Sequence, residues 1–100
     1  MTKSLYAPVT PGDVLKYEFL VEYGLSQNGL AHAVGVSPNR ITEIVNNRRR
    51  ITADTAVRLA LFFGNSPEFW ANLQSWYDLK VATKDLPAAK RHRIVAARAA

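Results

Sequence analysis

The stretch GVSPNRITEIVNNRRR, Gly35 to Arg50, holds the pattern that restricts the fold of this 100-residue chain most narrowly. Its glycine is typical of a turn. Ser37 followed by Pro38 is typical of a helix start, because serine caps a helix and proline suits its first turn. Spacings of three and four then place three aliphatic side chains on one face of the helix: Ile41, Ile44 and Val45. The helix is expected to end at Asn46–Asn47, since asparagine tolerates the left-handed backbone conformation.

A second short helix is predicted directly before this stretch. Ser26 is its expected cap, and its apolar side chains are Leu30, Ala31 and Val34. Ala31 is small enough to let two helices cross closely, and Gly35 suits the left-handed turn between them. Together with the aliphatic residues of the following helix, this order is the sequence pattern of a helix-turn-helix motif.

Three further helices are expected around the motif, and no strand pattern or internal repeat is present. They begin and end at residues typical of those positions: Pro11 to Gly24, Thr52 to Gly64, and Ser66 to Pro87. The predicted fold is all-α, a compact five-helix bundle. Its expected parts are an N-terminal arm, a helix-turn-helix domain with a C-terminal dimerisation helix, and a basic tail: residues 1–10, 11–86 and 87–100.

Composition excludes several classes of protein. One domain with one core suits 100 residues, and the absence of cysteine excludes disulfides and thiolate metal sites. No secretion signal or membrane-spanning run is recognisable, so we expect a cytoplasmic protein without a membrane partner. The tail from Pro87 contains four basic and no acidic residues, which leaves nine basic against eight acidic residues elsewhere. Net charge therefore does not indicate nucleic-acid binding. Any inference of such binding depends on the local clustering of side chains.

The polar face of the Pro38 helix supplies that clustering. Opposite its aliphatic residues lie side chains that can read base edges, and we expect base contacts from Ser37, Asn39, Arg40 and Glu43. Phosphate contacts are expected from a second set: Gln27, Thr42, Asn46, Arg48 and Arg49. The alternative is a merely solvated face, in which Ser37 only caps, Asn46 only ends the helix and Glu43 pairs with an arginine. No DNA contact is assigned to Arg50, because it precedes the apolar Ile51 and its side chain can turn away from the DNA.

The last predicted helix has more aromatic surface than one side of a small core needs. Its aromatic residues are Phe69, Trp70, Trp76 and Tyr77. Spare aromatic area is typical of an interface, so we expect Trp76 and Tyr77 to form the contact of a homodimer. Trp70 suits the core and an interface equally well.

Catalysis is not indicated. The two histidines, His32 and His92, lie in different segments, and no metal-ligand spacing or glycine-rich phosphate loop is present. We therefore expect no enzyme activity, no cofactor and no metal. Asp54, in the first turn of a predicted helix, is expected to stabilise the helix dipole.

From Pro11 to Val81 the sequence resembles HigA-type antitoxins, within the Cro/repressor-like helix-turn-helix class. The segments that carry the resemblance are PGDVLKYEFL and GLSQNGLAHAVGVSPNRITEIVNNRRRITADTAVRLALFFGNSPEFWANLQSWYDL, and RRRITADTAVRLALFFGNSPEFW is the most specific part. The resemblance implies a homodimer that represses its own operon by binding double-stranded operator DNA. It also implies a partner, a small mRNA-cleaving ribonuclease toxin of the same operon, which the protein binds and neutralises.

Carried over by position, the operator-reading helix of the family corresponds to Ser37–Asn46, and Gln27 matches its phosphate-contacting glutamine. Asn47 stands where relatives often have glycine, and Gly29 inside a helix is expected to cost about 1 kcal/mol against alanine. The tail after Pro87 lies outside the pattern. Because the expected arm and tail are short, neutralisation is expected to use folded surface. The alternatives are a stand-alone repressor without a toxin, a protein-interaction module that has lost DNA binding, and an enzyme.

Overall fold

The computed structural model describes residues 9–99, and within them all regular structure is helical. The elements in chain order are α1 (Pro11–Asp13), η1 (Val14–Leu20), α2 (Gln27–Val34), α3 (Pro38–Val45), α4 (Ala53–Phe63), α5 (Pro67–Asp85) and α6 (Ala88–Ala99). α1 continues directly into η1, a π-helical segment in which the Val21 amide donates to the Lys16 carbonyl at 3.1 Å. The all-α prediction is confirmed, but the described residues form six helices, with α1 and η1 counted as one, where five were expected.

The helix starts lie where their caps were predicted, because a cap is a local interaction. Each hydroxyl accepts from a backbone N–H three residues later, at distances of 2.9 Å for Ser26, 3.4 Å for Ser37, 3.5 Å for Thr52 and 3.1 Å for Ser66. Left-handed residues end three of the helices or their turns, with φ of 76° at Gly35, 75° at Gly64 and 62° at Asn47. Asn47 therefore adopts the left-handed conformation that it was expected to tolerate.

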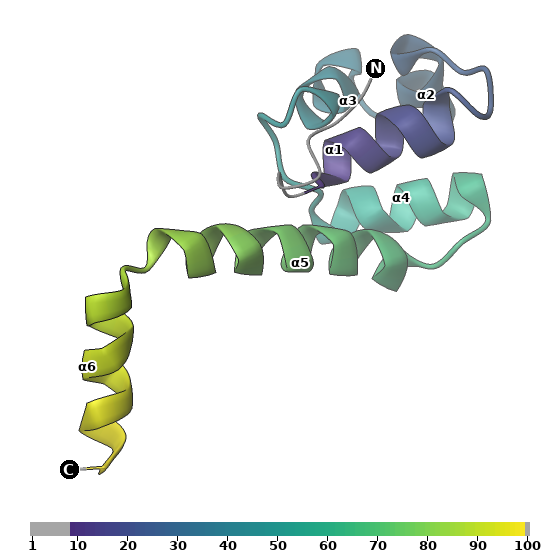
Figure 1. Cartoon of the computed structure of the whole chain (residues 1–100). Coiled ribbons are helices and arrows are strands. Elements are labelled where there is room, and N and C mark those ends of the chain that lie inside the picture. The colour runs from purple at the N-terminus through teal and green to yellow at the C-terminus, as the bar shows by residue number, and fades with distance from the viewer. Residues whose placement is uncertain (1–8, 100) are drawn as a thin grey trace.

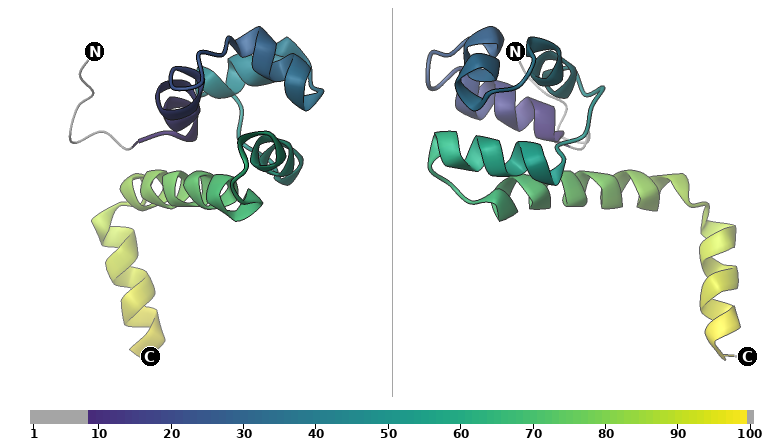
Figure 2. Two further views of the ribbon diagram at one scale, coloured as in Figure 1. Left: turned by 90° about the vertical axis from the view of Figure 1, so that its right-hand side faces the viewer. Right: turned by 180° about the vertical axis from the view of Figure 1, so that it is seen from behind.

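The core lies between α1, η1, α2, α3, α4 and the first half of α5. α4 packs along the first half of α5, while α2 crosses α3 and α1 lies against both α3 and α5 (Figures 1 and 2). The largest fully buried side chains of the core include Trp70, Leu15, Leu30, Ile41, Ile44 and Leu59. Trp70 is 0 % exposed, packs against Phe19 with ring centroids 4.7 Å apart, and donates from Nε1 to Asn65 Oδ1 at 2.9 Å. Trp70 is thus a core residue.

The end of the chain departs from the compact bundle that was expected. The second half of α5 extends beyond the core, and α6 turns away from it at a sharp angle (Figure 1). None of the described residues of α6 is buried, and the described chain is 55 Å long in its longest dimension. Arg91 fixes the corner, because its Nε donates to the Leu86 carbonyl at 3.0 Å and its Nη2 donates to the Thr83 carbonyl. These carbonyls lie at the end of α5, where helical partners are lacking.

Candidate nucleic-acid interface

The geometry of α2, α3 and the turn between them is that of a helix-turn-helix. Ala31 is completely buried where the two helices meet, and its carbonyl accepts from the amides of Gly35 and Val36, both at 3.0 Å. Ile41 and Ile44 of α3 are also buried, so the opposite face of α3 is directed outward. The pattern of small residue, glycine and two aliphatic residues therefore positions α3 as predicted.

The residues of this segment that were predicted to contact bases or phosphates share the outward face. Asn39 and Asn46 are exposed, while Arg40, Thr42 and Glu43 are partly exposed. Ser37 is exposed as well, but its hydroxyl already accepts from the Arg40 amide in the helix cap. The structure thus brings these predicted side chains together at α3, where Arg40 and Glu43 each have a charged partner.

Arg40 is joined to α4 through Asp54. Its Nη1 lies 2.7 Å from Asp54 Oδ2, which also accepts from Arg58 Nε at 3.0 Å. Hydrogen bonds from Arg40 and from Arg58 hold the pKa of the Asp54 carboxyl below its ordinary value. Arg58 also donates to the carbonyls of Val34 and Gly35, at 2.8 and 3.3 Å, and so satisfies the end of α2. Asp54 does lie in the first turn of its helix, but it also organises this cluster.

Glu43 is paired with an arginine, as one of the two alternatives for it predicted. Its Oε1 lies 2.8 Å from Arg49 Nε and 2.6 Å from Arg49 Nη2. The pair connects α3 with the loop that follows it. A glutamate engaged in this way is less available to accept from a cytosine amino group.

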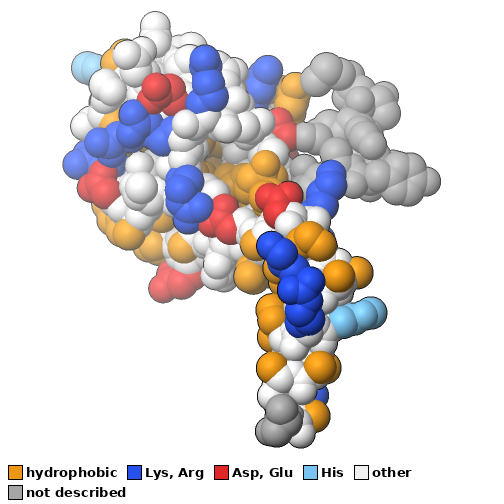
Figure 3. Space-filling view, turned by 90° about the vertical axis from the view of Figure 1, so that its left-hand side faces the viewer, with side chains coloured by type: hydrophobic (Ala, Val, Ile, Leu, Met, Phe, Trp, Pro, Cys, Tyr) orange, Lys and Arg blue, Asp and Glu red, His pale blue; other side chains and the backbone are white. Residues whose placement is uncertain are grey.

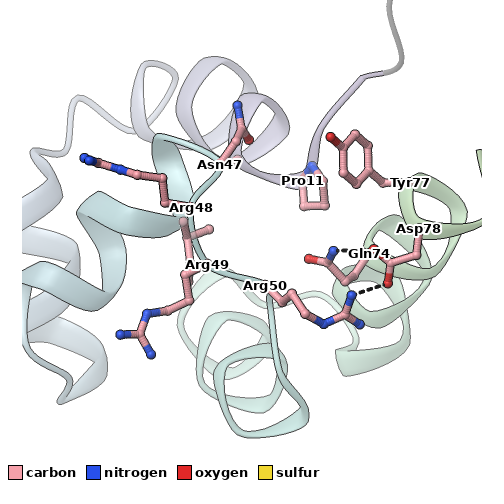
Figure 4. A pocket seen from close by; sticks show the side chains of 10 residues that line it. Pro11, Asn47, Arg48, Arg49, Arg50, Gln74, Tyr77 and Asp78 are labelled. Atoms are coloured by element: carbon pink, nitrogen blue, oxygen red, sulfur yellow. Dashed lines mark hydrogen bonds and ion pairs between the residues drawn. The ribbon is translucent and has the colours of Figure 1, made fainter. Parts of the chain in front are cut away.

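The three consecutive arginines after α3 have different surroundings, which Figure 4 shows from close by. Arg49 pairs with Glu43, and Arg50 turns away toward α5, where its Nη1 donates to Asp78 Oδ2. Among the described residues, Arg48 has no ion-pair or side-chain hydrogen-bond partner, and it is exposed. Arg48 is therefore the loop cation most available to an external phosphate.

A cavity of about 220 Å³ lies between this loop and α5. Its wall includes Pro11, Asn47, Tyr77 and the buried amide of Gln74. Gln74 Oε1 accepts from the Ile51 amide at 2.8 Å, and Gln74 Nε2 donates to Asp78 Oδ1 at 3.0 Å. Burial opposes ionisation of Asp78, but hydrogen bonds from Arg50 and Gln74 outweigh it, and the carboxyl pKa lies below its ordinary value.

The remaining predicted residues lie at separate places. Gln27 is the first residue of α2 and borders a shallow hollow with Lys16. On α5, Trp76 is 64 % exposed, whereas Tyr77 is partly buried beside the cavity (Figure 4). Figure 3 shows a mixed surface of basic and acidic side chains on the main body, and a row of basic side chains with apolar neighbours along α6.

The part of the chain that the structure describes lacks a metal-binding cluster and a membrane-spanning helix. No three histidine, cysteine or acidic side chains there are grouped as they would be to hold a metal ion. No helix between residues 9 and 99 has the length and hydrophobicity required to cross a membrane.

The sequence of this chain is similar to those of known proteins. The family model described as "Helix-turn-helix" matches residues 16–70. Virulence-associated protein I of Dichelobacter nodosus is 51 % identical over 77 residues, which cover 77 % of this chain and 71 % of that protein. Antitoxin HigA-1 of Vibrio cholerae is 42 % identical over 79 residues, covering 79 % and 74 % of the two chains.

A solved structure agrees with these relatives in sequence and in fold. It is that of the Pseudomonas aeruginosa antitoxin HigA with the higBA promoter, which is 42 % identical to this chain. The match covers 88 % of this chain and 91 % of that one, with a TM-score of 0.77. The chain therefore belongs to the helix-turn-helix family and, within it, to the HigA-type antitoxins.

Proposed function

We propose that this protein is the antitoxin of a type II toxin–antitoxin system, and that it represses its own operon by binding operator DNA. The observation that carries the proposal is the outward polar face of α3, held by buried Ile41 and Ile44 in a helix-turn-helix. The similarity to an antitoxin solved with its promoter supports the same function. DNA binding requires no catalytic group, and the protein acts by binding alone.

On the operator, Asn39 and Arg40 read bases from the N-terminal half of α3, with Ser37 beside them. Asparagine pairs with adenine and arginine with guanine in the major groove. The phosphate contacts come from the flanking side chains: Gln27, Thr42, Asn46, Arg48 and Arg49. Glu43 contributes mainly by orienting Arg49, with which it pairs at 2.6 Å.

Replacing Arg48 or Arg49 by alanine is expected to weaken binding to all DNA sequences alike. Each phosphate contact releases counterions, so the slope of log affinity against log salt should fall by about 1 for either variant. The measurement is fluorescence anisotropy with operator and scrambled DNA over a salt series. Arg93→Ala on exposed α6 removes the same charge far from α3 and serves as control, with an unchanged slope. A variant that loses operator affinity but keeps the full slope would contradict a phosphate contact.

The protein acts as a two-fold dimer through the part of α5 that extends beyond the core. Trp76 and Leu79 there are 64 % and 62 % exposed, and Tyr77 lies beside them on the same helix. One recognition helix reads too few bases for useful specificity, whereas a dimer presents two helices about 34 Å apart, one turn of DNA. Two copies of α5 that pack against each other through these side chains would form such a dimer.

Light scattering at micromolar concentration is expected to give about twice the chain mass of 11.1 kDa. Trp76→Asp should shift the mass toward that of one chain, because a charge would be buried without a partner. Leu61→Asp is the matched control, since Leu61 is 80 % exposed on α4, away from the proposed contact. A monomeric wild-type mass both with and without DNA would defeat the dimer.

The second partner is a small mRNA-cleaving toxin encoded in the same operon, which folded surface of this protein binds and neutralises. Co-purification from the native operon, followed by identification of the bound protein and DNA, tests both partners together. Recovery of the operator and of a small ribonuclease is the expected result. Recovery of the operator alone, with no toxin gene nearby, would favour a stand-alone repressor.

A further inference from the structure

The amide of Gln74 joins two parts of the chain that the proposed function uses separately. It is a polar side chain on α5 that is only 7 % exposed, and its Oε1 accepts from the Ile51 amide 23 residues earlier. This backbone group lies directly after the arginine loop, defined as residues 48–50. Gln74 therefore fixes the end of that loop against the helix proposed to form the dimer.

Asp78 adds a second connection one turn further along α5. Its two carboxylate oxygens have different partners, since Oδ1 accepts from Gln74 Nε2 at 3.0 Å and Oδ2 from Arg50 Nη1. A continuous hydrogen-bonded series thus runs from the Ile51 amide through Gln74 and Asp78 to Arg50. This series holds the side chain of Arg50 and the backbone of Ile51, the residue directly after the loop.

The consequence is a division of the three loop arginines. Arg50 is directed toward α5, while Arg48 and Arg49 extend from the opposite side of the loop (Figure 4). Arg49 is also paired, but its partner Glu43 belongs to α3, so that pair stays beside the proposed DNA surface. Asp78 instead holds the Arg50 guanidinium on the side of α5, and Arg50 must leave this carboxylate before it can reach a phosphate. Arg50 therefore differs in kind from Arg48, although both are exposed cations of one short segment.

We propose that Gln74 and Asp78 are positioning residues for DNA binding: they hold the arginine loop so that Arg48 and Arg49 face the phosphates, and they withhold Arg50. The proposal rests on the proposed function, because it requires operator binding by the neighbouring α3. In this arrangement α5 lies on the side of the loop that faces away from the DNA, and it determines how many loop arginines contact phosphates. No residue of the pair touches DNA itself.

Asp78→Asn tests the withholding of Arg50. Asparagine keeps an oxygen for Gln74 but loses the charge that pairs with Arg50, so Arg50 becomes free to reach a phosphate. The salt slope of operator binding should become steeper by about 1, and affinity for scrambled DNA at low salt should rise roughly 2- to 10-fold. Combining Asp78→Asn with Arg50→Ala should return the slope to the wild-type value. Asp85→Asn, which removes one negative charge from the end of the same helix, should leave the slope unchanged.

Arg50→Ala alone and Gln74→Leu complete the test. Arg50→Ala should leave the wild-type slope unchanged, and this variant does not depend on the folding of Asp78→Asn. Gln74→Leu should lower operator affinity about 3- to 10-fold and speed hydrogen exchange at the Ile51 amide, without a steeper slope. A slope that falls by about 1 in Arg50→Ala, or equal slopes in Asp78→Asn and Asp85→Asn, would overturn the proposal while leaving operator binding intact. Failure of the wild-type protein to bind operator DNA would overturn the proposed function and this inference together.

Discussion

The double variant Asn39→Ala/Arg40→Ala is expected to lose operator binding while it still neutralises the cognate toxin. Each side chain that pairs with a base edge contributes about 1–3 kcal/mol of discrimination, so losing both should cost about 2–6 kcal/mol. At about 1.4 kcal/mol per factor of ten, this corresponds to an affinity lower by roughly 30-fold to more than 10,000-fold. Anisotropy with operator DNA measures the loss, and rescue of cells expressing the toxin measures neutralisation.

The structure requires one control for this experiment, because Arg40 also pairs with Asp54. Asp54→Asn breaks that pair but keeps both base-reading side chains, so it should retain operator binding. Thermal stability should change little in the double variant, since Asn39 is exposed and Arg58 still neutralises Asp54. Loss of binding in Asp54→Asn equal to that of the double variant would show that the ion pair, and not base contact, explains the effect.

Neutralisation provides the second half of the same test. If α3 serves only the operator, the double variant should rescue cells as well as the wild-type protein does. A folded double variant that fails to rescue would mean that the toxin covers α3, so the DNA-binding and toxin-binding surfaces overlap. That outcome would be compatible with the antitoxin function but not with separate surfaces.

Local features of the sequence predicted most of the fold correctly. Ser26, Ser37, Thr52 and Ser66 each cap a helix, because a cap depends only on residues within one turn. The apolar spacings also identified the buried face of α3, where Ile41, Ile44 and Val45 are buried. Once that face is known, the outward residues follow from helical geometry.

The partners of the charged residues could not be predicted in this way. Arg40 and Asp54 are 14 residues apart, and Arg50 and Asp78 are 28 residues apart, so their contacts depend on how the helices pack. Gln74 was missed for the same reason, as its partner at Ile51 lies on another element. One signal was available: the chain before the tail has nine basic and eight acidic residues, which permits extensive pairing.

For the basic tail, the helix could be predicted from the sequence, but the corner before it could not. Its alanine-rich and arginine-rich composition favours a helix, and α6 forms there without burying a residue. The sharp corner before it depends on Arg91, which satisfies carbonyls of residues 83 and 86. Composition indicates that such a segment can be helical, but it does not indicate that one arginine will cap the preceding helix.

The close approach of α1 to α3 leads to the second prediction of large effect, for Gly12→Ala. Helix propensity alone would make this change stabilising by about 1 kcal/mol, because alanine is the better helix former. In the structure, however, a Cβ at Gly12 would lie 2.1 Å from the Ile44 carbonyl oxygen and 2.6 Å from Asn47 Oδ1. The first of these atoms belongs to the backbone of α3, so the helices themselves must separate.

Overpacking of this kind costs about 1–3 kcal/mol and occasionally more, and we expect the upper end because a backbone atom must move. In a domain of this size, that cost should lower the melting temperature by roughly 10–20 °C. Gly29→Ala is the matched control, since its Cβ would meet only side chains, Ser26 Oγ at 3.0 Å and Leu25 Cδ1 at 3.2 Å. There the gain in helix propensity and the crowding of the cap oppose each other, and the melting temperature should stay near that of the wild-type protein.

Operator binding gives a second measurement of the same contact. Asn47, with φ of 62°, leads from α3 into the arginine loop, and the added methyl group would displace both Asn47 and the last turn of α3. Gly12→Ala should therefore weaken operator binding even at temperatures where it remains folded, although Gly12 is buried and cannot touch DNA. A Gly12→Ala protein that melts at or above the wild-type temperature would show that α1 and α3 do not approach so closely. The sign of the change thus distinguishes this packing from the effect of helix propensity alone.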